Sequence, residues 1–325
     1  MAYFAIGVDL GGTNLRIAAV SEGGEIIDVI TTATEVKRGR DQVIAEMTEA
    51  IKTVSGRLKA QTLMGVGIGV PGIIDMATGM LRKSPNLPGW EDYPVREEIE
   101  RRLGSRVILE NDANAAALGE LWIGAGKGAD DLCMFTLGTG VGGGIVLNGQ
   151  IWHGMTGMAG ELGHTPVDPN GRACGCGSRG CVEQYASATA VKRMAMEAVE
   201  SGKAPELAAA LKRDSELSSK IVFELARMGD APAQKIFDIV GESLGISIAT
   251  AINTLNLPIY VVGGGVSAAW DAFSPKMFET VKQRSFIYLA TGPESGRHSP
   301  TVIRRAQLGS DAGILGAARL PMLAK

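Results

Sequence analysis

The apolar positions of this chain fall into short runs that are bounded by glycine, proline and polar residues. Apolar runs of this length between turn residues are typical of buried strands. The clearest example is LMGVGIGV, which ends just before Pro71 and Gly72. The pattern predicts strands at residues 3–9, 14–20, 25–31, 63–70, 106–111 and 301–308, two strands separated by a glycine turn within 132–148, and one at 259–265 that enters a glycine turn.

Other segments repeat their apolar residues at the spacing of a helix. Between residues 41 and 59 these include Val43, Met47 and Ile51, and we expect Asp41 to cap this helix. Pro94 suits the first turn of a short helix that ends near residue 103. Further helices are expected at residues 113–122, across 189–256 with breaks near Gly202 and Gly229, after residue 265, and at 312–320. Because strands are followed by helices through most of the chain, the pattern predicts an α/β protein with mixed sheets.

Length and composition fit a globular protein of two domains. The chain has 325 residues, of which 45% are apolar and 21% charged, and its net charge is −3. This charge does not indicate binding to nucleic acid or to an anionic membrane. The first residues enter a strand directly, without the features of a signal peptide. No apolar stretch approaches the roughly 20 residues of a membrane span, so we expect a cytoplasmic protein.

Glycine accounts for 44 residues and is concentrated in a few turns. Three of these turns lie at residues 9–14, 138–140 and 263–265. Turns without side chains let backbone N–H groups approach an anion, and a helix that starts after the third turn adds positive potential. One such turn alone is equally well explained as an ordinary hairpin, but three together favour a bound nucleotide. Neither a P-loop nor a Rossmann site is expected, because G-x-x-x-x-G-K-[ST] is absent and a strand follows the first turn.

Two aspartates lie at the ends of predicted strands. Asp9 precedes the first glycine turn, where it is either structural or suited to hold Mg²⁺ through water. Asp112 begins the helix that follows the strand at 106–111. It is either a helix cap or a general base that takes the proton from a sugar hydroxyl as that oxygen attacks the γ-phosphorus of ATP.

Residues 160–183 contain a histidine and three of the four cysteines of the chain. The cysteines form the pattern C-x-C-x4-C, and His164 lies ten residues before the first of them. Three thiolates and one imidazole complete a tetrahedral zinc shell. Free thiols or disulfides are the alternative, but three cysteines cannot all pair with one another. We expect Cys133 to be a small core residue, and the sequence gives no role for His153 or His298.

Together these residues resemble the ROK family of sugar kinases, whose fold is the two-domain α/β actin-like ATPase (ribonuclease H-like) fold. The match covers nearly the whole chain in family order, and its most specific part is the cysteine element with the Glu-x-Gly-His that precedes it. SPNLPGW at 84–90 is similar to the sugar-side loop of the family's glucokinases. The matching motifs are DLGGTN at 9–14, ENDANAA at 110–116, GTGVGGG at 138–144, GELGH at 160–164, CGCGSRGCVE at 174–183 and GGG at 263–265.

The resemblance implies roles for three groups of residues. Asp112 matches the catalytic base, and His164 is expected to bind zinc through one ring nitrogen and to face the sugar with the other. The implied substrate-binding residues are Gly72, Asn111, Asp112, Glu161, His164 and Glu183. The implied nucleotide-binding residues are Asp9, Gly11, Gly12, Thr13, Asn14, Thr139, Gly140, Gly264 and Gly265. The implied metal ligands are His164, Cys174, Cys176 and Cys181.

The function that the resemblance implies is ATP-dependent phosphorylation of the 6-hydroxyl of glucose, with ATP, Mg²⁺ and a structural Zn²⁺. The alternatives are a kinase for another hexose such as N-acetylmannosamine or fructose, a sugar-sensing regulator that does not turn over, and a structural zinc protein. Some family members are repressors with an amino-terminal helix-turn-helix. None is expected here, because the chain begins directly at the first strand.

The resemblance also implies a domain organisation. A small α/β domain would comprise residues 1–121 and 311–325, and a large one, residues 122–310, would carry the zinc loop and a dimer surface. The two domains are expected to close over the sugar. The family is usually dimeric or tetrameric, so a homodimer or homotetramer is expected, with hexose and ATP as the other partners.

Overall fold

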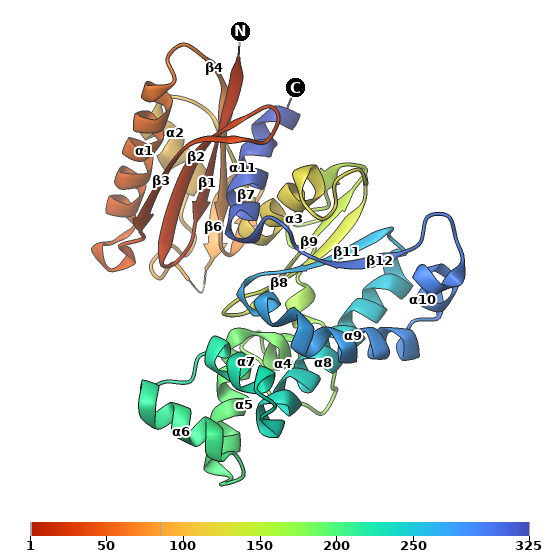
Figure 1. The fold of residues 1–325 in the computed structure, drawn as a ribbon. Coiled ribbons are helices and arrows are strands. Elements are labelled where there is room, and N and C mark those ends of the chain that lie inside the picture. The colour runs from red at the N-terminus through yellow and green to blue at the C-terminus, as the bar shows by residue number, and fades with distance from the viewer. Residues whose placement is uncertain (1, 85, 325) are drawn as a thin grey trace. The chain divides into compact units, whose positions relative to one another are not determined.

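The computed structural model describes residues 2–84 and 86–324, and the chain divides into two compact units (Figure 1). The first unit comprises Met1–Asp131, Gly144–Gly160 and Ser310–Lys325. The second unit comprises Leu132–Gly143 and Glu161–Gly309. Each unit is built from strands and helices, which confirms the predicted α/β class.

The first unit is built on a five-stranded sheet with the order β3-β2-β1-β4-β7. Strands β1, β2 and β3 form an antiparallel meander, whereas β4 and β7 run parallel to β1. A small hairpin of β5 and β6, which the sequence pattern did not predict, follows β4. The strands are β1 (Tyr3–Leu10), β2 (Asn14–Ser21), β3 (Ile26–Ala33), β4 (Thr62–Val70), β5 (Ile73–Asp75), β6 (Met80–Lys83) and β7 (Val107–Asn111).

The two faces of this sheet are covered in different ways. Successive side chains of a strand point to opposite faces. The even-numbered residues of β1, including Ile6 and Val8, lie in one apolar core with Val43 and Met47 of α1 (Arg40–Arg57). The opposite face meets α11 (Ala312–Leu323), and Gly7 there is so close that a Cβ atom would lie 2.0 Å from a carbonyl oxygen of that helix.

Strand β4 follows the same rule, because Val66, Ile68 and Val70 join the apolar core while the glycines between them face α11 and α3. A Cβ atom at Gly67 would lie 1.9 Å from the carbonyl oxygen of Ala317. The alternation of glycine with apolar residues in LMGVGIGV therefore lets a helix pack directly on the strand backbone. The remaining helices of this unit are α2 (Val95–Leu103) and α3 (Asp112–Ile123).

A second five-stranded sheet has the order β10-β9-β8-β11-β12, in which β8, β11 and β12 are parallel. Its strands are β8 (Leu132–Leu137), β9 (Val141–Leu147), β10 (Gln150–Ile151), β11 (Ile259–Gly263) and β12 (Val302–Arg305). The helices of the second unit are α4 (Glu183–Ala186), α5 (Ala188–Glu200), α6 (Pro205–Asp214), α7 (Ser219–Arg227), α8 (Ala231–Leu255), α9 (Trp270–Arg284) and α10 (Phe286–Thr291). Short 3₁₀ turns occur at Val36–Arg38, Leu162–His164, Gly265–Ala269, Pro293–Ser295 and Gly309–Asp311.

Helix α8 is the longest helix of the described chain, with 25 residues. Contrary to the expectation from the sequence, it is long and apolar enough to cross a membrane, but 67% of its most apolar window is buried inside the protein. It packs against α9, α7 and α5. Burial of this kind is typical of the core helix of a globular unit.

The structure corrects the predicted helix caps. Gly39, not Asp41, is the N-cap of α1, and Asp41 lies in the first turn. Pro94 is the N-cap residue of α2 and not its first helical residue. The helical segment 189–256 has a break that was not predicted, at Ser215, whose backbone is left-handed with φ of 61°. These differences arise because caps depend on backbone angles that apolar periodicity does not encode.

Candidate functional site

The carboxyl ends of three parallel strands carry the predicted site residues of the first unit. Asp9 lies near the end of β1, Gly72 follows β4, and Asn111 ends β7 immediately before Asp112. In an open α/β sheet, parallel strands bring their carboxyl ends to one edge, where ligands bind. The topology therefore brings together residues that are more than one hundred positions apart in the sequence.

The junction of β7 and α3 holds Asp112 in place. Asn111 is the N-cap of α3, and its Oδ1 accepts hydrogen bonds from the backbone N–H groups of Ala113 at 2.9 Å and Asn114 at 3.2 Å. Its Nδ2 donates to the carbonyl oxygen of Gly72 at 3.2 Å. The interpretation of Asp112 as the helix cap is therefore wrong, because Asn111 has that role and Asp112 is the first residue of the helix.

The two aspartates of this edge influence each other. Burial, together with the negative charge of Asp112, raises the pKa of Asp9 to about 6, although the positive charge of Arg16 opposes the shift. Arg16 lies opposite Asp9 on β2 and pairs with Asp311 at 2.6 Å. Two carboxylates that interact in this way repel each other, and a cation bound between them removes the repulsion. Carboxylate oxygens are ligands that Mg²⁺ prefers, so the two aspartates fit a magnesium site.

The first glycine turn joins β1 to β2. The N–H of Gly11 donates to the carbonyl oxygen of Asn14 at 2.9 Å, and the carbonyl oxygen of Thr13 accepts from the N–H of Thr34 at 2.7 Å. A Cβ atom at Gly12 would lie 2.9 Å from the carbonyl oxygen of Asn86. Glycine is therefore required where this turn meets the loop at 84–90, of which Pro85 lies outside the described residues.

In the second unit, the turn between β8 and β9 lies against Glu183. The Oε2 of Glu183 accepts the N–H of Val141 at 3.0 Å, and a Cβ atom at Gly140 would lie 2.4 Å from the same oxygen. The carbonyl oxygen of Thr139 accepts from the hydroxyl of Thr189 at 2.7 Å. The structure thus brings the predicted nucleotide-binding Thr139 and Gly140 next to the predicted substrate-binding Glu183.

The third glycine turn follows β11. Gly264 has a φ of +82°, and a Cβ atom there would lie 2.5 Å from the carbonyl oxygen of Leu137, which ends β8. Gly265 then begins a 3₁₀ turn, and the α-helix α9 starts only at Trp270. Only glycine fits the position of Gly264, so this turn places bare backbone beside the end of β8.

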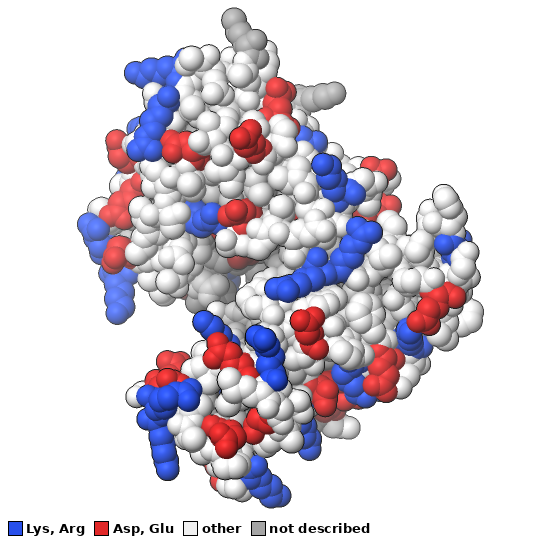
Figure 2. All heavy atoms as spheres, in the orientation of Figure 1, with Lys and Arg blue, Asp and Glu red and all other residues white. Residues whose placement is uncertain are grey.

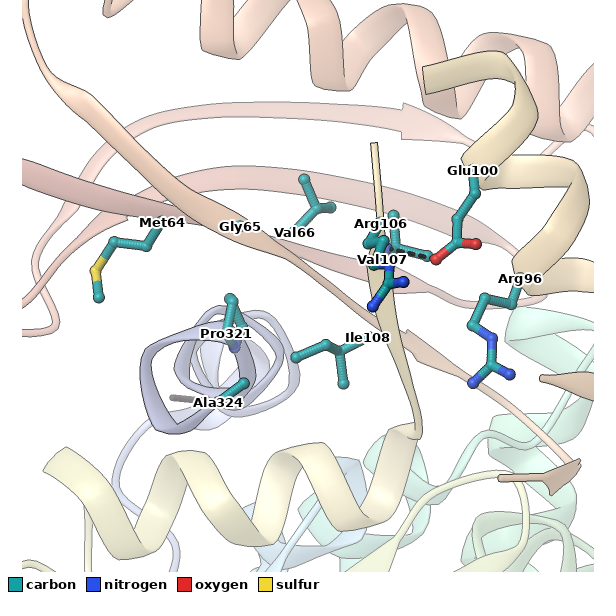
Figure 3. Close-up of a pocket in the computed structure, with 10 residues that line it drawn as sticks. All are labelled: Met64, Gly65, Val66, Arg96, Glu100, Arg106, Val107, Ile108, Pro321 and Ala324. Carbon is teal, nitrogen blue, oxygen red and sulfur yellow. Dashed lines mark hydrogen bonds between the residues drawn. The ribbon is translucent and has the colours of Figure 1, made fainter. Parts of the chain in front are cut away.

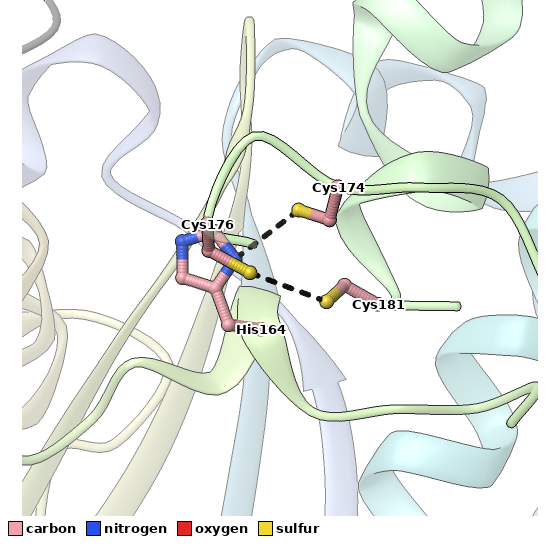
Figure 4. Close-up of side chains that lie close together, drawn as sticks. All are labelled: His164, Cys174, Cys176 and Cys181. Carbon is pink, nitrogen blue, oxygen red and sulfur yellow. Dashed lines mark hydrogen bonds between the residues drawn. The ribbon is translucent and has the colours of Figure 1, made fainter. Parts of the chain in front are cut away.

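The predicted metal ligands converge in the second unit, as Figure 4 shows. The Nδ1 of His164 lies 3.6 Å from the Sγ of Cys174, and the Sγ atoms of Cys176 and Cys181 are 3.7 Å apart. All four ligand atoms lie within 4.8 Å of one another. A tetrahedron with metal–sulfur bonds of about 2.3 Å has edges of about 3.8 Å, so the donor set and its spacing fit zinc.

The surroundings of the cluster also favour a metal. The side-chain amide of Gln184 donates to the Sγ of Cys174 at 3.6 Å, and Arg193 donates to the carbonyl oxygen of Gln184 at 2.5 Å. Such partners hold ligating thiolates in place. The other ring nitrogen of His164, Nε2, lies 3.9 Å from the Oε2 of Glu161. The two nitrogens of His164 therefore face different groups, and the contact of the second nitrogen with a sugar stays a prediction.

No role for His153 was predicted from the sequence, but the structure pairs it with Glu110. The Nε2 of His153 lies 2.7 Å from the Oε2 of Glu110, whose side chain is only 2% exposed. This hydrogen bond to Glu110 raises the pKa of His153, against the opposing effect of burial. The sequence contains one signal from which this pair could have been predicted. Glu110 ends an apolar strand, and a carboxylate that is buried there needs a partner.

The first unit has a pocket of about 630 Å³, and Figure 3 shows the residues that line it. It is lined by Met64 and Val66 near the start of β4, by Arg106 and Val107 at the start of β7, and by Pro321 of α11. These are the amino ends of the parallel strands, at the edge opposite Asp112. None of the described residues that line it is a predicted site residue.

Charged side chains of both signs are interspersed on the face that Figure 2 shows. Proteins that bind nucleic acid usually concentrate lysine and arginine on one surface. The mixed charges on this face agree with the small net charge of the chain.

The fold is that of a known family of sugar kinases. The chain belongs to the ROK family, whose sequence profile matches residues 5–322. Its two mixed α/β sheets match ROK sugar kinase structures, which confirms the actin-like ATPase fold. The cluster of His164 and the three cysteines is consistent with the structural zinc site of this family.

The most similar relatives include two glucokinases. The chain is 42% identical to the glucokinase of Halalkalibacterium halodurans over 314 residues, which cover 96% of this chain and 92% of that protein. It is 40% identical to the glucokinase of Thermotoga maritima over 318 residues, which cover 97% and 96%. A ROK family glucokinase from Streptomyces griseus, in complex with glucose and AMPPNP, aligns with a TM-score of 0.79 and 35% identity over 98% of both chains.

Proposed function

We propose that the protein is an ATP-dependent hexose kinase that phosphorylates the 6-hydroxyl of glucose, with Asp112 as general base. The observation that carries this proposal is the position of Asp112. It is held at the first turn of α3 by the cap of Asn111, at the sheet edge that also carries Asp9. A general base must lie at a fixed position within hydrogen-bond reach of the proton that it removes.

In this proposal the residues of the chain align and polarise the reactants. Asp112 takes the proton of the 6-hydroxyl as its oxygen attacks the γ-phosphorus of ATP, and ADP leaves. The bare amides of the turns at 9–14, 138–140 and 263–265 bind the nucleotide. Asn14 belongs to the first of these turns. When bound, Mg²⁺ neutralises phosphate charge, and Asp9 is the residue suited to hold it through water.

Asn111, Glu161, His164 and Glu183 are proposed to bind the hexose hydroxyls, with Gly72 beside Asn111. The zinc ligands would be His164, Cys174, Cys176 and Cys181, and the metal, when bound, supplies rigidity to their loop rather than chemistry. The similarity to glucokinases favours glucose.

Turnover of the Asp112→Asn variant tests the proposed base. The purified chain is assayed with glucose and MgATP by coupled detection of ADP. We expect kcat to fall by about 10²-fold or more, because positioned proton transfer contributes typically 10² to 10⁴-fold, while glucose binding stays near that of the wild type. Asp271→Asn is a matched control, since Asp271 lies exposed in the first turn of α9. Turnover of Asp112→Asn near the wild-type rate would refute the assignment.

A panel of hexoses separates the proposal from its alternatives. N-acetylmannosamine and fructose offer hydroxyls to the same side chains, so the highest kcat/KM identifies the substrate. A sugar sensor would bind a hexose without consuming ATP. The expected result is ADP formation that depends on both sugar and Asp112, with glucose as the preferred acceptor.

Two further proposals concern organisation. We propose a cytoplasmic homodimer or homotetramer without nucleic-acid or membrane partners, which light scattering after size-exclusion chromatography tests. We also propose domain boundaries after residues 121 and 310. Residue 121 lies inside α3, whereas the first segment of the first compact unit ends at Asp131. Limited proteolysis distinguishes the two positions, because cleavage concentrates at exposed segments between domains.

A further inference from the structure

The side chain of Glu110 is a buried carboxylate near the end of β7, two residues before α3 begins. Its Oε1 accepts the backbone N–H of Asn111 at 2.9 Å and the side-chain Nδ2 of Asn114 at 3.0 Å. Its Oε2 lies 2.7 Å from the Nε2 of His153. Both carboxylate oxygens therefore have partners, which is what a charge with 2% exposure requires.

The register of β7 explains why Glu110 points at the helix and not at the apolar core. Val107 and Leu109 belong to the core cluster, so Glu110, between Leu109 and Asn111, lies on the opposite face of the sheet. On that face β7 contacts α3 and α11. A buried ion pair is weak evidence for stability, because apolar residues of similar size often stabilise a core as well or better. The burial of Glu110 with His153 is therefore not explained by stability alone.

Glu110 is connected to Asp112 by a short chain of bonds. Its Oε1 accepts the backbone N–H of Asn111, and the side chain of Asn111 in turn caps α3 and donates to the carbonyl oxygen of Gly72. A rotation of the Glu110 side chain would break the bonds to Asn111 and Asn114 together. The angle at which α3 begins, and with it the carboxylate of Asp112, therefore depends on the orientation of Glu110.

His153 is the group that fixes this orientation. It follows β10, and its carbonyl oxygen accepts the N–H of Ala159 at 3.2 Å, which closes the loop between them. The imidazole side chain is 35% exposed, whereas its carboxylate partner is buried. Glu110 is 43 residues away in the sequence, so the pair ties the loop after β10 to the end of β7.

We propose that Glu110 and His153 form a positioning pair that holds Asn111 and Asp112 in the geometry needed for phosphoryl transfer. This inference rests on the proposed roles of Asp112 and Asn111. Neither Glu110 nor His153 is a catalytic residue in it, because both act through the backbone and cap of the junction. Misplacement of a reacting group by about 1 Å can cost a hundredfold in rate.

Three single variants test the pair. His153→Gln keeps a side-chain donor that can reach Glu110, His153→Leu removes the donor, and Glu110→Gln removes the charge while keeping an amide oxygen as acceptor. His298→Leu is the matched control, since His298 is exposed. We expect His153→Leu to lower kcat/KM for the hexose on the order of tenfold to a hundredfold, with KM for ATP unchanged. His153→Gln should restore most of this loss, and His298→Leu should have no effect.

A double-variant cycle and a stability measurement separate positioning from folding. If the two residues act as a unit, His153→Leu costs much less in the Glu110→Gln background than in the wild type. A merely structural role would lower the melting temperature and the active fraction but leave kcat and KM per folded molecule unchanged. That result, or a His153→Gln variant as impaired as His153→Leu, would overturn the proposal.

Nuclear magnetic resonance detects the interaction of Glu110 with His153 independently of enzyme activity. The chain has only three histidines, so the signals of the His153 ring can be assigned by substitution. The pKa of His153 should lie above the ordinary value of a histidine and should fall in Glu110→Gln, in agreement with its direction in the structure. The backbone amides of Asn111 and Asp112 should shift in His153→Leu and return in His153→Gln. If these amide signals do not shift in His153→Leu, the positioning pair is refuted even when the protein is an active kinase. If they shift as expected but the protein has no kinase activity, the proposed function is refuted and the pair is not.

Discussion

The cap of α3 gives a prediction whose magnitude follows from the structure. Replacing Asn111 by alanine removes the acceptor of two backbone N–H groups, at 2.9 and 3.2 Å, and the donor to Gly72 at 3.2 Å. Loss of an N-cap costs typically ~1 kcal/mol, and loss of a further hydrogen bond costs about 1 kcal/mol, so the sum is about 2 kcal/mol. For a unit of this size, the melting temperature should fall by roughly 4–8 °C.

Asn111→Ser separates the two contributions. Serine is also a good cap, but its hydroxyl does not replace the amide donor to Gly72, so we expect a loss of about 1 kcal/mol. Both variants should raise KM for the hexose, because the proposed role of Asn111 in sugar binding needs its amide. Ser218→Ala is the control, since Ser218 caps the exposed start of α7. It should lose cap stability without any change in KM.

Denaturant unfolding followed by tryptophan fluorescence measures these losses. Trp90, Trp122 and Trp152 lie in the first unit and Trp270 in the second, so the signal reports mainly on the unit that contains Asn111. An unfolding free energy of Asn111→Ala within about 0.5 kcal/mol of the wild type would refute the capping argument, because caps of this kind contribute 0.5–2 kcal/mol. A serine variant as unstable as the alanine variant would refute the division into two contributions.

Three further predictions concern the metal, the packing of α11 and pH. Cys176→Ser should lose bound zinc, melt at lower temperature and show a higher KM for the sugar, and wild-type protein without zinc by metal analysis would contradict this. Gly316→Ala would place a Cβ atom 1.6 Å from a carbonyl oxygen of α3 and should lower the unfolding free energy by about 1–3 kcal/mol or more, as overpacking does. Gly56→Ala is the control, because the space around Gly56 is open, and it should leave the melting temperature unchanged or raise it. Glu110 raises the pKa of His153 in the folded state, so the pair stabilises the fold below about pH 6.5. This contribution to the unfolding free energy is lost as the pH rises through the folded pKa. When the unfolding free energy is measured against pH, the Glu110→Gln variant should lack this decrease.

The elements that the sequence predicted well are those whose signal is local. The apolar runs of β1, β4 and β7 are buried on both faces, so each is a continuous apolar segment that needs no knowledge of its neighbours. The cluster that fits zinc was predicted for the same reason, because Cys174, Cys176 and Cys181 lie within eight positions of one another. Ligands that are close in sequence are brought together by a single loop.

What the sequence did not predict depends on contacts between distant segments. The glycines of β4 are explained only by the packing of α11 and α3 against the strand, and both helices come later in the chain. His153 had no recognisable role because its partner, Glu110, is on another element. Asn111 and not Asp112 proved to be the cap, since only backbone geometry distinguishes two adjacent capping residues.

A structure of the protein with glucose and a non-hydrolysable ATP analogue tests the central claim most directly. The account predicts that the carboxylate of Asp112 lies within hydrogen-bond reach of the 6-hydroxyl, at about 2.6–3.2 Å, and that this hydroxyl is in line with the γ-phosphorus. A carboxylate turned away from the hydroxyl, or a different hydroxyl facing the phosphate, would contradict it.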